Sequence, residues 1–215
     1  MLLVLAGLLG ASLFIFSSEP VQAEETEVWA LILTNKQTPI PEEYEAELEL
    51  IDGSHEIDRR IVKELSDMFA AAEKDGVILE VCSAHRSYER QVELFRNKIN
   101  GLMKSGLCYY DAYKTASYSV TVPGTSEHQL GLALDIVTPG YTDLDAGFGD
   151  TDAGKWLAAH SAEYGFILRY PKGKEHITGI IYEPWHFRYV GKKAAKEIME
   201  KRITLEEYLE DLLEE

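Results

Sequence analysis

The stretch Ser126–Ile136, SEHQLGLALDI, decides how the rest of this sequence is interpreted. It opens with a charged turn and continues as an apolar run interrupted by His128 and Asp135, seven positions apart. A buried aspartate has to be paired or bound to a metal, because an isolated carboxylate is very costly in an apolar interior. No basic residue lies near Asp135 in the sequence. A metal ion bound by both side chains would satisfy them.

A second histidine stands in the segment EPWHFRYVG, where His186 follows Glu183 by three positions. Pro184 disfavours helix at the residue before it, so the segment differs from the helical H-E-x-x-H pattern and is expected to be a strand entered through a kink. Two histidines and one carboxylate leave a coordination position of Zn²⁺ open, as catalytic zinc sites do. Glu183 would then serve as general base and acid. Two alternatives are an Fe(II) site on the same residues and a site in which Glu183 is the ligand and Asp135 is structural.

The composition restricts the possible partners. The chain has 215 residues, enough for one domain with a core, and its formal charge is −16. Nucleic acids and anionic membranes attract basic surfaces, so neither is expected to bind this acidic chain. We predict a soluble, solvated surface and a monomer.

The N-terminus carries a separate signal. Residues 2–16 form a continuous apolar run, shorter than the ~18 to 20 residues that a membrane-spanning helix needs. The run and the small residues after it predict a secretory signal peptide over residues 1–23, cleaved after Ala23. An uncleaved N-terminal anchor is the alternative. Both place the domain at residues 24–215 outside the cytoplasm, with membrane contact only through the N-terminal segment.

The remaining pattern indicates one α+β domain, a small antiparallel sheet flanked by helices. Apolar spacing and capping residues predict helices at 58–75, 87–106, 109–119 and 151–165 and two more in the tail, with Asp58, Ser87, Thr151 and Thr204 as N-caps. Short β-branched and aromatic runs predict strands at 28–35, 77–85, 132–137, 166–171, 177–182 and 185–191.

Two cysteines, Cys82 and Cys108, are too few for a disulfide framework. They could form one bridge in an oxidising compartment. Alternatively, Cys82 is a buried free thiol within its apolar run.

The motifs together resemble those of the VanY-type D-alanyl-D-alanine carboxypeptidases. SEHQLGLALDI matches S-x-H-x-x-G-x-A-x-D and EPWHFRYVG matches the E-x-x-H segment, while CSAHRSYERQ, PGTSEHQ and YGFILRYP occur in the same order as in that family. The resemblance covers about Trp29 to Leu209 and implies a zinc peptidase with the α+β fold of the hedgehog N-terminal domain. It assigns Zn²⁺ to His128, Asp135 and His186, catalysis to Glu183, the substrate carboxylate to Arg86, and weaker substrate contacts to Gln91 and Ser126.

The resemblance thus implies removal of the C-terminal D-alanine from peptidoglycan stem peptides. Two other functions stay open at this point. One is an L,D-carboxypeptidase that acts on tetrapeptide stems. The other is a cell-wall-binding module that keeps zinc without catalysis, although the presence of Glu183 and Arg86 weighs against it.

Overall fold

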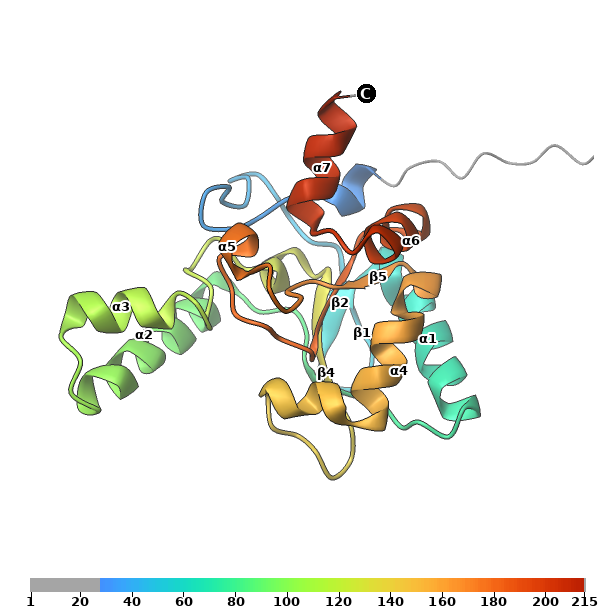
Figure 1. The fold of residues 1–215 in the computed structure, drawn as a ribbon, viewed down its shortest axis with the longest axis horizontal. Coiled ribbons are helices and arrows are strands. Elements are labelled where there is room, and N and C mark those ends of the chain that lie inside the picture. The colour runs from blue at the N-terminus through green and yellow to red at the C-terminus, as the bar shows by residue number, and fades with distance from the viewer. Residues whose placement is uncertain (1–27, 215) are drawn as a thin grey trace, which may run out of the picture.

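The computed structural model describes residues 28–214, and its centre is a four-stranded antiparallel sheet with the strand order β3-β4-β6-β5 (Figure 1). Two further strands, β1 and β2, pair as a separate ribbon. The predicted α+β architecture is confirmed. The strands are β1 Leu48–Leu50, β2 Glu56–Asp58, β3 Glu80–Ser83, β4 Ala133–Val137, β5 Phe166–Leu168 and β6 His186–Tyr189.

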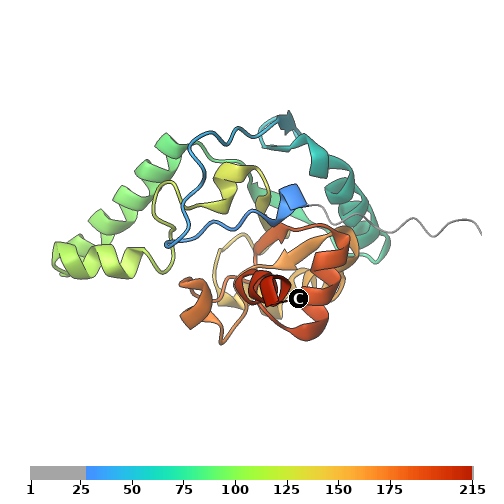
Figure 2. The ribbon, with the colours of Figure 1, turned by 90° about the horizontal axis from the view of Figure 1, so that it is seen from above.

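Helices surround the sheet. The α-helices are α1 Val62–Lys74, α2 Tyr88–Lys104, α3 Tyr109–Ala116, α4 Asp152–His160, α5 Glu175–Thr178, α6 Lys192–Lys201 and α7 Leu205–Glu214. Shorter 3-10 helices are η1 Val28–Leu31, η2 Arg59–Ile61, η3 Glu127–Leu130, η4 Ala146–Asp150 and η5 Ser161–Tyr164. The pair α2–α3 projects from the body as an arm, in both ribbon views (Figures 1 and 2).

The predicted helix starts are borne out by side-chain caps. Ser87 accepts the amide of Arg90 at 3.2 Å, and Thr151 accepts that of Gly154 at 3.0 Å. Satisfying these otherwise unpaired amides fixes where α2 and α4 begin. Asp58 caps the 3-10 turn η2 that precedes α1, and Thr204 caps α7.

The two central strands separate a core face from a polar face. β4 and β6 pair with Leu134 opposite Phe187 and Asp135 opposite His186. Side chains alternate across a strand, so partners in register share a face. Leu134 and Phe187 are fully buried in the main hydrophobic core, whereas Asp135 and His186 face the other way. The register therefore brings together two side chains that are 51 residues apart in the chain.

Two predicted strands are wrong. Residues 28–35 begin as the 3-10 helix η1, because the carbonyls of Ala30 and Ile32 accept the Arg188 guanidinium at 2.8 and 2.9 Å and the segment joins no sheet. Residues 177–182 finish the short helix α5 and continue as a loop. Gly179 takes the left-handed conformation there (φ 70°), which ends the helix and turns the chain away from an extended path.

The predicted bridge between Cys82 and Cys108 is absent, and the alternative, a buried free thiol at Cys82, is right about the free thiol and wrong about its burial. Cys82 and Cys108 are free and exposed. Cys82 lies on the sheet-edge strand β3, at the irregularity between Val81 and Ser83, and it lines the cavity that also contains Asp135 and His186. The helix predicted over 109–119 ends three residues earlier, at Ala116.

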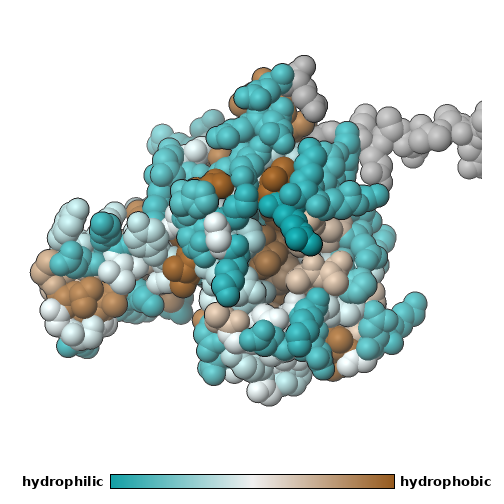
Figure 3. All heavy atoms as spheres, viewed as in Figure 1, coloured by the Kyte–Doolittle hydropathy of each residue, from teal (hydrophilic) through white to brown (hydrophobic). Residues whose placement is uncertain are grey.

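Hydrophilic side chains cover most of the face shown in Figure 3, in keeping with the acidic composition (Figure 3). Within residues 28–214, no helix combines the length and the apolar character that crossing a bilayer requires. The segment predicted as a signal peptide or anchor, residues 1–23, lies outside the described residues.

Candidate active site

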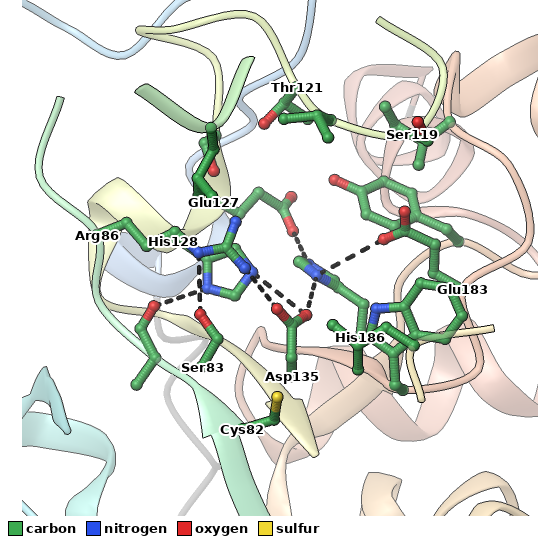
Figure 4. Close-up of a pocket in the computed structure, with 18 of the residues that line it drawn as sticks. Cys82, Ser83, Arg86, Ser119, Thr121, Glu127, His128, Asp135, Glu183 and His186 are labelled. Carbon is green, nitrogen blue, oxygen red and sulfur yellow. Dashed lines mark hydrogen bonds and ion pairs between the residues drawn. The ribbon is translucent and has the colours of Figure 1, made fainter. Parts of the chain in front are cut away.

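Three predicted ligands converge on the polar face of the sheet. His128 comes from η3, Asp135 from β4 and His186 from β6, and their potential ligand atoms lie within 4.8 Å of one another. Oδ1 of Asp135 is 3.3 Å from Nε2 of His128 and 3.1 Å from Nδ1 of His186. Figure 4 shows the three side chains pointing toward a common point (Figure 4). Two imidazoles and a carboxylate, all buried, are the donors that suit Zn²⁺.

Hydrogen bonding determines which nitrogen of His128 is available. Nδ1 lies 2.7 Å from the carbonyl oxygen of Ala84, which can only accept, so Nδ1 carries the proton. The lone pair is then on Nε2, the nitrogen that faces Asp135. Burial, and next the charge of Arg86, lower the pKa of His128 to about 4, which keeps the ring neutral as a metal ligand must be.

His186 is surrounded by carboxylates. Its Nδ1 faces Asp135 and lies 3.9 Å from Glu183, while its Nε2 is 3.5 Å from Oε2 of Glu127 (Figure 4). Burial alone would lower the pKa of His186, but Asp135 and Glu127 outweigh it and raise the pKa to about 9. A metal bound at Nδ1 therefore displaces a proton.

Partners on both sides of Asp135 keep its carboxyl group ionised. Burial opposes its ionisation, but the two histidines and Arg86 outweigh burial and keep the pKa of Asp135 well below its usual range. Oδ1 faces the two histidines, whereas Oδ2 accepts a charge-assisted hydrogen bond from Nη2 of Arg86. The Nε of Arg86 donates to Ser83 at 2.9 Å. One oxygen of Asp135 thus faces the two histidines and the other faces Arg86.

Glu183 has a different environment from the three residues of the cluster. It precedes the strand β6, and its amide donates to the carbonyl of Tyr170 at 3.2 Å, which fixes the kink at Pro184. Burial raises the pKa of the Glu183 carboxyl to about 8. A carboxyl group with a pKa near the working pH beside an open metal position is suited to proton transfer in both directions.

These groups line one cavity of about 700 Å³. Arg86 and Ser126 line it, as do all three ligands and Glu183. Gln91 is fully buried and is not among the lining residues that the structure describes. Its amide donates instead to the carbonyl and hydroxyl of Thr121 at 2.7 and 3.1 Å, and Thr121 does line the cavity.

A group of buried charged residues next to the site was not singled out from the sequence: Glu127, Arg169, Arg188 and Glu206. The signal was present, because Arg169 in FILRYP and Arg188 in HFRYV interrupt apolar runs just as Asp135 does. Such arginines need buried carboxylates as partners. The sequence pattern does not identify those partners, which come from segments 37 and 42 residues away from Arg169.

His55, His160 and His176 lie outside the metal cluster, although His55 lines the cavity. His55 and His160 pair locally with Asp52 and Glu163, and His176 is exposed.

Comparisons with known proteins agree with this geometry. The family model VanY, D-alanyl-D-alanine carboxypeptidase, matches residues 54–192. A D-alanyl-D-alanine carboxypeptidase of Enterococcus faecalis (strain ATCC 700802 / V583) is 44% identical over 188 residues, which make up 87% of this chain and 68% of that protein.

Two solved structures show the same fold. A mutant of the vancomycin-resistance D,D-pentapeptidase VanY in complex with Zn(II) is 45% identical, with a TM-score of 0.78, covering 84% of this chain and 99% of that one. The LD-carboxypeptidase LdcB is 42% identical, with a TM-score of 0.72, covering 83% of this chain and 84% of that one. The match extends over most of the chain and over all five motifs that suggested the resemblance. This chain therefore belongs to the VanY family of D-alanyl-D-alanine carboxypeptidases.

Proposed function

We propose that this protein is a zinc carboxypeptidase that removes the C-terminal D-alanine from peptidoglycan stem peptides ending in D-Ala-D-Ala. The observation that carries the proposal is the convergence in one cavity of a buried His128–Asp135–His186 cluster with the Glu183 carboxyl. The family match and the zinc-containing relative support it.

His128, Asp135 and His186 would hold the ion, with Nε2 of His128, Oδ1 of Asp135 and Nδ1 of His186 being the atoms that face one another. When bound, Zn²⁺ supplies a Lewis acid that polarises the scissile carbonyl and acidifies water. Glu183 takes a proton from the attacking water and delivers it to the departing amine of D-alanine. A carboxyl group with its pKa raised by burial can hold that proton between the two transfers.

Arg86 recognises the terminal carboxylate of the substrate. It lines the cavity with 18% of its side chain exposed, and its contacts to Asp135 and Ser83 engage Nη2 and Nε. A guanidinium has five N–H donors in a planar fork, so donors remain for a carboxylate. Ser126 contacts the substrate from the cavity wall, and Gln91 acts indirectly by holding Thr121.

The reaction takes place outside the cytoplasm, where the cell wall is built. Residues 1–23 are proposed to direct the chain there, as a cleaved signal peptide or as an anchor. The acidic surface does not prevent binding of a small anionic peptide, because the cavity itself carries Arg86 and Arg90.

The test is mass spectrometry of the purified full chain incubated with a pentapeptide stem and, separately, with a tetrapeptide stem, each with and without a chelator. We expect loss of one alanine from the pentapeptide only, abolished by the chelator and restored by zinc. Glu183→Gln is the inactive control. Cleavage of the tetrapeptide only would reassign the protein as an L,D-carboxypeptidase. Zinc binding without cleavage of either peptide would favour the binding-module function.

A further inference from the structure

A line of buried charges runs from the metal ligand His186 to the C-terminal helix α7. Oε2 of Glu127 lies 3.5 Å from Nε2 of His186, on the side of the ring away from Asp135 (Figure 4). Oε1 of Glu127 accepts Nε of Arg169 at 2.7 Å and lies 3.1 Å from Nη1 of Arg188. The side chains of Glu127, Arg169 and Arg188 are completely buried.

The far end of this line is Glu206 of α7. Nη1 and Nη2 of Arg169 donate to the two oxygens of Glu206, each at 2.7 Å. This is the bidentate arrangement in which a guanidinium fits a carboxylate best. Arg169 therefore bridges Glu127 and Glu206, and its orientation is fixed from both sides. The group contains two carboxylates and two guanidinium groups, so it is neutral overall.

Stability alone does not account for such a group. Removing four charges from water carries a large desolvation cost, and well-packed apolar residues of similar volume are often at least as stable. What the charges provide is orientation. With Oε1 held by the two arginines, Oε2 of Glu127 is directed at Nε2 of His186, which leaves Nδ1 facing Asp135. Carboxylates that hold the second nitrogen of a ligating histidine set its tautomer and raise metal affinity.

We propose that Glu206, Arg169 and Glu127 form a positioning relay that fixes the ring of His186, which makes α7 part of the metal site although it lies outside the cavity. The three are positioning residues, since each acts through the next. The inference rests on the zinc site of the proposed function and extends it to the C-terminal helix.

The test compares three variants of the full chain: Glu127→Gln, Glu206→Gln and the control Glu207→Gln. Glu207 is the neighbour of Glu206 on α7 and binds Lys174 at 2.7 Å, so the control also removes an ion pair from the same helix turn. Zinc affinity is measured by competition with a chromophoric chelator, without substrate. The visible absorption spectrum of the cobalt-substituted protein reports ligand geometry, and thermal unfolding reports stability.

We expect Glu127→Gln and Glu206→Gln to weaken zinc binding by about tenfold or more and to change the cobalt spectrum. Glu207→Gln is expected to leave both unchanged, whatever it does to the unfolding temperature. The proposal is overturned if Glu206→Gln lowers the unfolding temperature but keeps the wild-type zinc affinity and spectrum, because the ion pair is then only structural. Failure of the proposed function looks different: the wild-type chain would bind zinc and respond to these variants, yet cleave no stem peptide.

Discussion

Glu183→Gln should stabilise the metal-free protein, and by an amount that depends on pH. Burial raises the pKa of Glu183 from its usual 4.5 to about 8. Below pH 4.5 the carboxyl is protonated in the folded and the unfolded chain alike, so the full stability is present. As the pH rises toward 8, the unfolded chain loses the proton first and the folded state becomes relatively less stable. The loss amounts to about 1.4 kcal/mol per pH unit, or about 5 kcal/mol once the pH exceeds 8.

Glutamine has nearly the same shape and does not ionise, so the stability of the variant does not fall with pH for this reason. Its free energy of unfolding should exceed that of wild type by about 4 kcal/mol more at about pH 9 than at about pH 5. Urea unfolding of the chelator-treated proteins at both pH values measures the difference. Glu73→Gln, which removes one exposed carboxylate from α1, is the control and should show no such trend. A difference for Glu183→Gln that stays constant across this range would refute the reasoning.

Three further predictions concern the ligands, the substrate and the core. Asp135→Asn should reduce bound zinc well below one equivalent, measured by elemental analysis after dialysis; retention of one equivalent would contradict its role as a ligand. Arg86→Gln should lower kcat/KM about 100-fold on a stem with a free C-terminal carboxylate, since a charge-assisted hydrogen bond contributes ~1.5–3 kcal/mol, yet cause little further loss on a C-terminally amidated stem. An equal loss on both stems would mean that Arg86 serves only Asp135. Phe187→Ala should cost about 3–5 kcal/mol in urea unfolding, because Phe187 is fully buried opposite Leu134; a cost below 1 kcal/mol would mean that the core closes over the gap.

Much of the candidate site could be predicted because its residues stand out within short segments of the sequence. His128 and Asp135 stand out as ionisable residues within an apolar run, and Glu183 and His186 flank a proline kink. Caps were predictable for the same reason, since Ser87 and Thr151 bond amides only three residues away.

The relay was not predictable, because its partners come from separate segments. Glu127 follows a serine that resembles a turn residue, and Glu206 belongs to an acidic tail in which four other glutamates look alike. Only the tertiary fold, which brings Glu206 within 2.7 Å of Arg169, selects it from among them. Segment 28–35 was mispredicted for a related reason: its backbone acceptors are satisfied by the side chain of Arg188, and apolar patterning carries no information about such partners.

The pairing of Asp135 with His186 across β4 and β6 would give a zinc ion held by both side chains a role in strand alignment. A slip of one residue between these strands would turn one of the two side chains to the opposite face, and the ion would lose a ligand. Only the native alignment would gain the free energy of zinc binding. Each tenfold excess of free zinc over its dissociation constant favours that alignment by about 1.4 kcal/mol. A bound zinc ion would thus stabilise the native register of the sheet over slipped ones. A shortage of zinc during folding would leave misaligned chains as well as inactive enzyme.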